Sequence, residues 1–174
     1  EVVLLGADAV RRVGVRSGDE VWRTTPEVEQ PSLSVAGEMV VLGGDDGAQA
    51  LDLDDGDPLW TDDDAAGLTT AWELHDGRVL GATPYAVSAA PGGSGPEDRT
   101  AWVLDEDGPV GDELVLPEGR DDPWSWSDGE DLLAVGGVLY DEDLEVLTDD
   151  YVSVLPTTDG FYGVGEDGTV WLLP

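Results

Sequence analysis

The stretch GGDDGAQALDLDDGDPLW, residues 43–60, decides how the chain folds. Aspartates and glycines crowd into it, so it is either a metal-binding loop or two tight turns around a strand. The acids cluster in the triplets DDG 45–47 and DDG 54–56, and the alternating run AQALDL separates them. Asp-Gly pairs supply the positive φ angles that tight hairpins need. The stretch therefore predicts two hairpin turns with a strand between them.

The metal-binding alternative fails on ligand spacing. An EF-hand calcium loop needs oxygen ligands at positions 1, 3 and 5, Gly at position 6 and Glu at position 12. Counted from Asp52, position 5 is Gly56 and position 12 is Asp63. The sequence therefore predicts no resident cofactor or metal, and it leaves loosely bound divalent cations open because carboxylates are abundant.

The pattern of this stretch recurs along the chain. Residues 2–24 and 40–62 align as an apolar run, a Gly/Asp turn, an alternating run, a second turn and a last run that contains Trp22 or Trp60. A period near 40 residues built of short strands is typical of propeller blades. No window carries apolar residues at helical spacing with caps. The fold class predicted is all-β, a partial β-propeller of four-stranded antiparallel blades, with about five blades or part-blades.

The predicted blades form a single β-propeller domain or segment over residues 1–174. The first unit lacks its innermost strand, the last lacks its outermost strand, and the third ends in a strand over 113–116. The units run approximately over 1–25, 31–62, 68–117, 123–149 and 151–174.

The run ALDLDDGDPLW resembles the tryptophan-docking repeat of pyrroloquinoline-quinone-type (quinoprotein-type) β-propellers, Ala-x-Asp-x-x-Thr-Gly-x-x-x-Trp. In this sequence the matching residues are Ala50, Asp52, Gly56 and Trp60, and Asp55 replaces the threonine. The resemblance implies that the glycine forms a tight turn and that the indole packs between adjacent blades.

A weaker copy of the repeat lies in RVGVRSGDEVW, where Ser17 takes the threonine place and Gly18 and Trp22 are in register. The repeat is shared by enzymes and by non-enzymatic scaffolds. The quinone dehydrogenases that carry it often have a vicinal cysteine pair, and this chain has no cysteine. The resemblance therefore favours a non-catalytic propeller and leaves enzyme activity undecided.

The charge of the chain restricts its partners. Asp and Glu number 40 against seven basic residues, all arginine, which gives a formal net charge of −33. Such a charge repels nucleic-acid phosphates and anionic lipid. No run of about 20 apolar residues is present that would insert into a membrane. The sequence therefore predicts no nucleic-acid partner and no direct membrane insertion, and it favours a basic protein or peptide.

Catalytic motifs are weak. A Ser/His/Asp triad would have to use His75, the only histidine, and no G-x-S-x-G is present. Carboxylate pairs are too numerous to indicate a glycosidase site. Trp124 and Trp126 share one face of an expected strand, where packing between blades is favoured over ligand binding.

The candidate binding surface is one rim of the propeller. Successive strands run antiparallel, so the turns between the second and third strands of a blade emerge at the same rim as the inter-blade loops. The long segment 84–99, rich in Pro, Gly and Ser, would join this rim as a binding arm. The predicted rim residues are Asp45, Asp46, Asp62, Asp63, Asp64, Asp121 and Asp122.

We therefore expect a non-enzymatic acidic scaffold or recognition domain, part of a larger extracytoplasmic or secreted protein. Two alternatives stay open: a fragment of a quinoprotein-type or other propeller enzyme whose catalytic residues lie outside this segment, and a sensor domain of a membrane-anchored signalling protein.

Overall fold

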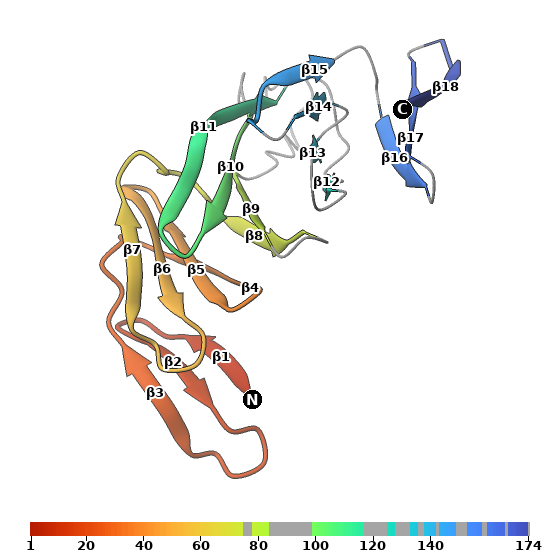
Figure 1. The fold of residues 1–174 in the computed structure, drawn as a ribbon. Helices are drawn as coiled ribbons and strands as arrows, with labels where there is room; N and C mark the ends of the chain where they lie inside the picture. The colour runs from red at the N-terminus through yellow and green to blue at the C-terminus, as the bar shows by residue number, and fades with distance from the viewer. Residues whose placement is uncertain are drawn as a thin grey trace, which may run out of the picture. The chain divides into compact units, whose positions relative to one another are not determined.

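The computed structural model describes residues 1–74, 78–83, 99–116, 125–127, 133–135, 138–141, 143–148, 153–157, 160–165 and 167–173. These residues form eighteen β-strands and no helix, so none of them belongs to a helix that would cross a membrane (Figure 1). The strands divide between two compact units: β1–β9 with residues 101–105 of β10 and 108–110 of β11, and residues 99–100 of β10 and 111–116 of β11 with β12–β18.

The first unit contains two antiparallel sheets and most of a third, with strand orders β1-β2-β3, β4-β5-β6-β7 and β8-β9-β10-β11. Each sheet is a meander, because every strand pairs with the next one along the chain. The first sheet comprises β1 (Val2–Leu5), β2 (Val10–Val13) and β3 (Glu20–Thr24). The second comprises β4 (Ser32–Ala36), β5 (Met39–Gly44), β6 (Gly47–Asp52) and β7 (Pro58–Asp62). The third comprises β8 (Thr70–Glu73), β9 (Val79–Ala82), β10 (Arg99–Asp105) and β11 (Gly108–Leu116).

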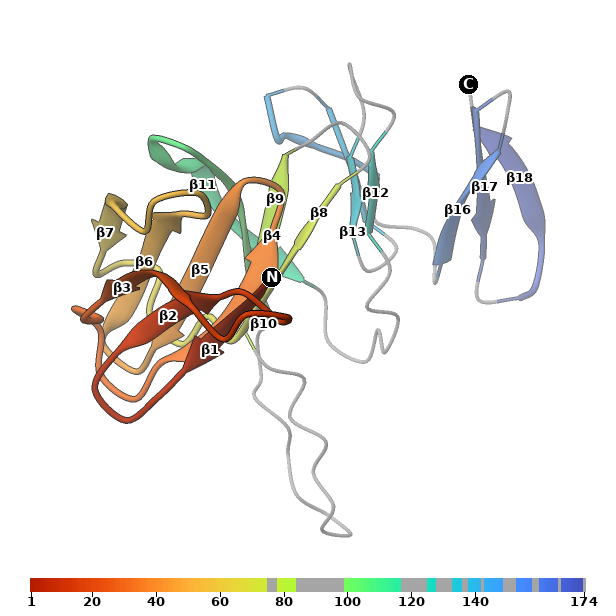
Figure 2. The same ribbon diagram turned by 90° about the horizontal axis from the view of Figure 1, so that it is seen from below.

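The second unit contains two more meanders, with orders β12-β13-β14-β15 and β16-β17-β18 (Figure 2). The four-stranded sheet comprises β12 (Ser125–Ser127), β13 (Leu133–Val135), β14 (Val138–Tyr140) and β15 (Val146–Thr148). The three-stranded sheet comprises β16 (Ser153–Thr157), β17 (Gly160–Val164) and β18 (Val170–Leu173).

The prediction of an all-β partial propeller is confirmed. Three sheets have four antiparallel strands, the first lacks the inner strand that the others have, and the last ends at its third strand. The start of β11 was predicted wrongly: β11 begins at Gly108, whereas the sequence predicted a strand only over 113–116. Glu106 and Asp107 form a two-residue turn, so strand pairing with β10 resumes directly at Gly108.

The outer strand pair of several blades carries the same irregularity. The register shifts by one residue between Arg12 and Val13 in the β2–β3 pair, and between Ala50 and Leu51 in the β6–β7 pair. A bulge of this kind increases the local twist and re-aims the following turn. The two aligned sequence repeats therefore share their backbone geometry as well as their residue pattern.

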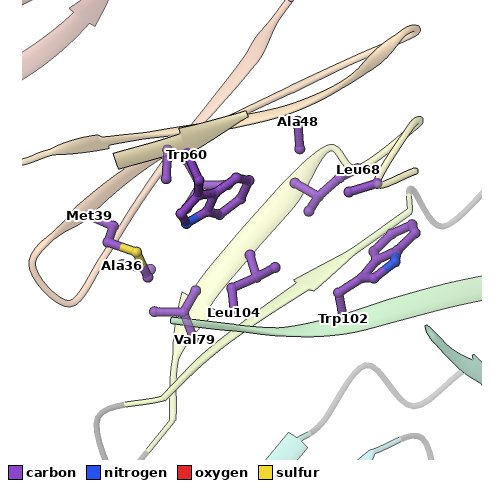
Figure 3. Packing of buried hydrophobic residues seen from close by; sticks show 11 residues of the cluster. Ala36, Met39, Ala48, Trp60, Leu68, Val79, Trp102 and Leu104 are labelled. Carbon is purple, nitrogen blue, oxygen red and sulfur yellow. The ribbon is translucent and has the colours of Figure 1, made fainter. Parts of the chain in front are cut away.

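The core of the first unit lies between its sheets, which contribute two apolar clusters. One cluster, between the second and third sheets, contains Met39, Trp60, Leu68 and Leu104 among its buried members (Figure 3). The other cluster, between the first and second sheets, is built around Trp22 and includes other buried side chains. β5 is buried along its whole length because apolar clusters cover both of its faces. Burial of aliphatic and aromatic side chains at about 25 cal/mol per Å² drives this face-to-face packing of blades.

Candidate functional site

The two repeat tryptophans anchor each blade to the turn of the next blade. Trp22 lies on β3 and is buried, and its indole Nε1–H donates a hydrogen bond to the Leu53 carbonyl oxygen at 2.9 Å. Thr24, on the same strand, donates its hydroxyl to the Gly56 carbonyl oxygen at 2.6 Å. Leu53 and Gly56 both belong to the turn between β6 and β7. The outer strand of the first blade is therefore fixed to the second blade by two hydrogen bonds.

The Trp22 indole packs directly against the backbone of Gly56. A Cβ atom at Gly56 would come within 2.5 Å of Trp22 Cδ2 and 2.6 Å of Cε3, so only glycine fits against the ring. Its φ of +78° also favours glycine. Gly18 occupies the same place in the first repeat with φ +75°, but a Cβ atom added there would meet no atom within 4 Å. The two glycines therefore share a backbone requirement, and Gly56 alone has a steric one.

Trp60 repeats the contact one blade further along. Its indole Nε1–H donates to the carbonyl oxygen of Asp105, the last residue of β10, at 2.8 Å. A Cβ atom at Gly108, the first residue of β11 after the two-residue turn, would lie 3.9 Å from Trp60 Cγ. Ala50 is fully buried and is the register partner of Trp60. A small residue at this position belongs to the core beside the indole.

Asp52 is a turn-forming residue. Its Oδ1 accepts the backbone N–H groups of Asp54 at 2.6 Å and Asp55 at 3.2 Å. Asp105 does the same in the next blade, accepting from Asp107 and Gly108. Side-chain bonds of this type hold the chain in a turn that replaces a ladder of strand bonds. The side chains of Asp52 and Asp105 are therefore used as hydrogen-bond acceptors for backbone N–H groups of their own turns.

The predicted acidic rim is assembled from three loops of the first unit. The backbone N–H of Glu29, in the loop between β3 and β4, donates to Asp46 Oδ1 at 2.8 Å in the β5–β6 turn. That turn also abuts the end of β7, since a Cβ atom at Gly47 would lie 2.6 Å from the Asp62 carbonyl oxygen. Asp62 Oδ1 accepts the backbone N–H of Asp64 at 2.7 Å. Residues from positions 27 to 64 thus meet at one end of the sheets.

The structure brings together five of the seven predicted rim residues: Asp45, Asp46, Asp62, Asp63 and Asp64. Asp121 and Asp122 lie outside the described residues, as do His75, Trp124 and residues 84–98 of the expected arm. Two further acids, Glu27 and Glu29, belong to the same rim, and both are exposed. The sequence rule that assigns inter-blade loops to this rim also covers Glu27 and Glu29, because both lie in the loop between β3 and β4.

We define the acidic rim as the seven acids Glu27, Glu29, Asp45, Asp46, Asp62, Asp63 and Asp64. Three arginines form ion pairs with acids of other regions: Arg11 with Glu20 at 4.0 Å, Arg23 with Asp8 at 3.6 Å and Arg12 with Asp54 at 2.9 Å. Glu20 and Asp54 lie at the opposite end of the strands from the acidic rim, whereas Asp8 lies in the β1–β2 turn, which is equivalent to the β5–β6 turn. Among the described residues, no group of three or more His, Cys, Asp or Glu side chains is arranged to hold a metal ion.

A groove of about 530 Å³ lies beside β1, away from the acidic rim. Arg12 lies at its edge and donates to the Leu53 carbonyl oxygen at 2.7 Å and to Asp54 Oδ1 at 2.9 Å. The hydrogen bond to Asp54, with a further ion pair to Glu1, raises the pKa of Arg12. The lining residues are Glu1, Val2, Val3, Arg12, Val35 and Leu53.

The chain has the fold class of a partial β-propeller. No protein-family model matches the sequence, and no curated protein matches it. BamB from Moraxella catarrhalis is similar in structure, with 16% identity and a TM-score of 0.49 over 97% of this chain and 56% of that chain. A computationally designed protein, Ika8, has 15% identity and a TM-score of 0.49, with 98% of this chain and 57% of that chain covered.

A third solved structure, a protein of unknown function from Bacteroides caccae, has 14% identity and a TM-score of 0.42. The match covers 92% of this chain and 80% of that chain. The chain spans just over half the length of BamB and of the designed protein.

Proposed function

We propose that this chain is a non-enzymatic β-propeller scaffold that recognises a basic protein or peptide through its acidic rim, as part of a larger extracytoplasmic protein. The observation that carries the proposal is the convergence of seven carboxylates from three loops at one end of the first unit. A concentrated negative field attracts positively charged partners and accelerates their encounter.

The core of the fold supports a scaffold role. The conspicuous repeat residues, Trp22, Gly56 and Trp60, are used in packing and in turn formation, so they are not free for chemistry. The pattern of Ala50, Asp52, Gly56 and Trp60, with its indole contacts, supports the assignment to quinoprotein-type repeats. That resemblance in turn supports an extracytoplasmic location.

The same charge argues against anionic partners. With a formal net charge of −33, the chain repels nucleic acid and anionic lipid surfaces. We propose no resident cofactor. Loosely held divalent cations fit the rim, because carboxylate oxygens are the ligands that Ca²⁺ and Mg²⁺ prefer.

Neutralising the rim tests the proposal. The rim-neutral variant combines Glu29→Gln, Asp63→Asn and Asp64→Asn. It spares Asp46 and Asp62, whose side chains accept backbone bonds. The probe is a rhodamine-labelled ten-residue peptide of alternating lysine and glycine, titrated by fluorescence anisotropy at low salt. We expect the Kd to rise about tenfold, equivalent to about 1.4 kcal/mol.

The matched control removes the same charge from the opposite end of the strands. The counter-rim variant combines Asp57→Asn, Glu106→Gln and Asp107→Asn in the β6–β7 and β10–β11 turns, where all three residues are exposed. Its Kd should stay within about twofold of the unmodified protein. Equal weakening by both variants would show that only net charge matters. Turnover with added quinone and calcium would instead support the enzyme alternative.

A further inference from the structure

Gln49 carries a buried hydrogen-bond donor that has no acceptor. The residue lies on β6 and is fully buried. Its Oε1 accepts the backbone N–H of Glu27 at 3.0 Å, whereas its Nε2 has no hydrogen-bond partner among the described residues. This orientation of the amide is fixed, because turning it over would place the donor Nε2 against the donor N–H of Glu27. A buried donor without a partner costs free energy, so its presence calls for a reason.

The unpaired donor belongs to the acidic rim. Glu27, whose backbone holds Oε1, is an exposed rim residue in the loop between β3 and β4. Its carboxylate Oε2 accepts the hydroxyl of Thr61 at 3.3 Å. Thr61, on β7, is the register partner of Gln49, so the two side chains are neighbours on one face of the sheet. Glu27 therefore contacts both members of this pair. We call Gln49, Glu27 and Thr61 the Gln49 subsite.

The Glu27 side chain can leave Thr61 without disturbing the core. Glu27 and Thr61 are both exposed, and the hydrogen bond between them is long, so water or a ligand replaces it at little cost. The backbone N–H of Glu27 stays bound to Gln49 and keeps the carboxamide in place. A ligand that draws the carboxylate away from Thr61 thus approaches a donor whose orientation is already set. A preoriented donor lowers the entropy cost of binding.

The groups of the subsite require a ligand that has both a positive charge and a hydrogen-bond acceptor. The Glu27 carboxylate pairs with a cation, and the Gln49 Nε2 needs an acceptor oxygen. Polyamines carry charge without an acceptor, and the waters of a hydrated metal ion point their hydrogens outward. Nucleic acids and acidic peptides have acceptors, but the net charge of −33 repels them. A basic polypeptide has both groups, because each of its residues carries a main-chain carbonyl.

We propose that the Gln49 subsite binds a basic polypeptide segment, with a lysine or arginine side chain on the Glu27 carboxylate and a main-chain carbonyl oxygen accepting from Gln49 Nε2. The first contact rests on the proposed function, since it uses the charge of the acidic rim. The second contact goes beyond charge, because it makes the rim distinguish a polypeptide from other polycations. Thr61 is a positioning residue that holds the Glu27 carboxylate in the free protein.

Side-chain amide signals in a proton–nitrogen correlation spectrum of the unmodified protein test both contacts. The chain has two glutamines, Gln30 and Gln49, and no asparagine, so the carboxamide region is easily assigned. Gln30 reports the acidic rim, because its Nε2 donates to Asp45 Oδ2 at 3.4 Å. The probes are the lysine–glycine peptide without its label and spermine, a polyamine without a carbonyl group. At saturation both probes should shift the Gln30 signal, and only the peptide should shift the Gln49 signal downfield.

The outcomes of this experiment separate the inference from the proposed function. If both probes shift Gln30 and neither shifts Gln49, the acidic rim stands as a charge-selective surface and the Gln49 subsite falls. If neither probe binds, both proposals fall. A shift of Gln49 by spermine equal to that by the peptide would show that the carboxamide responds to charge, and would also overturn the inference.

A matched pair of variants measures the contribution of the donor to affinity. Gln49→Met removes the carboxamide and keeps a side chain of similar length. Leu42→Met is the control, because Leu42 is the buried register partner of Gln49 on β5. In calorimetric titrations, Gln49→Met should raise the Kd of the peptide about fivefold and that of spermine by less than about twofold. Leu42→Met should leave both Kd values within about twofold.

Equal weakening of both probes by Gln49→Met would assign the residue a structural role in placing Glu27 and would refute the inference. Glu27→Gln tests the other contact and should weaken both probes, because both use the charge of its carboxylate. An unchanged peptide Kd in Glu27→Gln would overturn the assignment of the basic side chain to this residue.

Discussion

Replacing Gly56 and Gly18 by alanine separates the cost of backbone strain from the cost of the tryptophan contact. Both glycines have positive φ, +78° and +75°, and both occupy the glycine position of the repeat in the first unit. Only at Gly56 does an added Cβ meet the indole of Trp22, at 2.5 Å from Cδ2 and 2.6 Å from Cε3. Both substitutions therefore carry the cost of backbone strain, and only Gly56→Ala adds the cost of the contact with Trp22.

The magnitudes follow from these two terms. An alanine in the left-handed region costs about 1–2 kcal/mol at either position. Alanine also restricts the unfolded chain, which offsets about 0.4–1 kcal/mol equally in both variants. Forcing a methyl group into a packed contact costs about 1–3 kcal/mol, because Trp22 is held by its bond to Leu53 and cannot retreat freely. We expect Gly56→Ala to be less stable than Gly18→Ala by about 1–3 kcal/mol.

Urea unfolding followed by circular dichroism measures the difference, since the seven tryptophans complicate a fluorescence signal. The control is the same pair of substitutions in a Trp22→Ala background, where the ring is absent. There the excess cost of Gly56→Ala should disappear, as a double-mutant cycle requires for a direct contact. An excess below about 0.5 kcal/mol in the unmodified background would show that the indole does not lie on Gly56.

Trp60→Ala should reduce the free energy of unfolding by about 3–5 kcal/mol, because the indole is buried and hydrogen-bonded. Trp171→Ala, at an exposed position on β18, should change the free energy of unfolding by less than about 0.5 kcal/mol. Similar losses in the two variants would contradict this placement of Trp60. The Tyr140 hydroxyl is buried without a hydrogen-bond partner in the described part of the chain, so Tyr140→Phe should stabilise the fold by about 1 kcal/mol in urea unfolding at pH 7. Burial raises the pKa of Tyr140 to about 12, so the folded state keeps a proton that the unfolded chain loses near pH 10. Stability should therefore fall between about pH 10 and 12, and Tyr140→Phe should fall less steeply; parallel curves would show that Tyr140 does not titrate differently on folding. The melting temperature should rise from 0.1 M to 1 M NaCl, because the Debye length falls from about 10 Å to about 3 Å and screens the net charge of −33; an unchanged or lower midpoint would contradict the role of self-repulsion.

The sequence by itself determined the architecture, because the signals for short strands and tight turns are local. The triplet DDG 54–56 requires a turn with a glycine at positive φ, and Gly56 has that φ. The spacing of Trp22 and Trp60 indicated the blade repeat before any contact was known. The start of β11 was missed because strand resumes directly at Gly108 after a two-residue turn, within a stretch that contains Gly, Pro and acids.

Only the tertiary structure decided what these residues contact. The bond from Trp22 to Leu53 joins positions 31 residues apart, and the pair of Arg12 with Asp54 joins positions 42 residues apart. No local pattern specifies which turn receives an indole or which carboxylate receives an arginine. The groove beside β1 depends on walls contributed by two blades, from Val2 and Val3 on one side and Val35 on the other. Such features arise from packing between blades, because the shape of an interface is set by both surfaces and the sequence of either one describes only half of it.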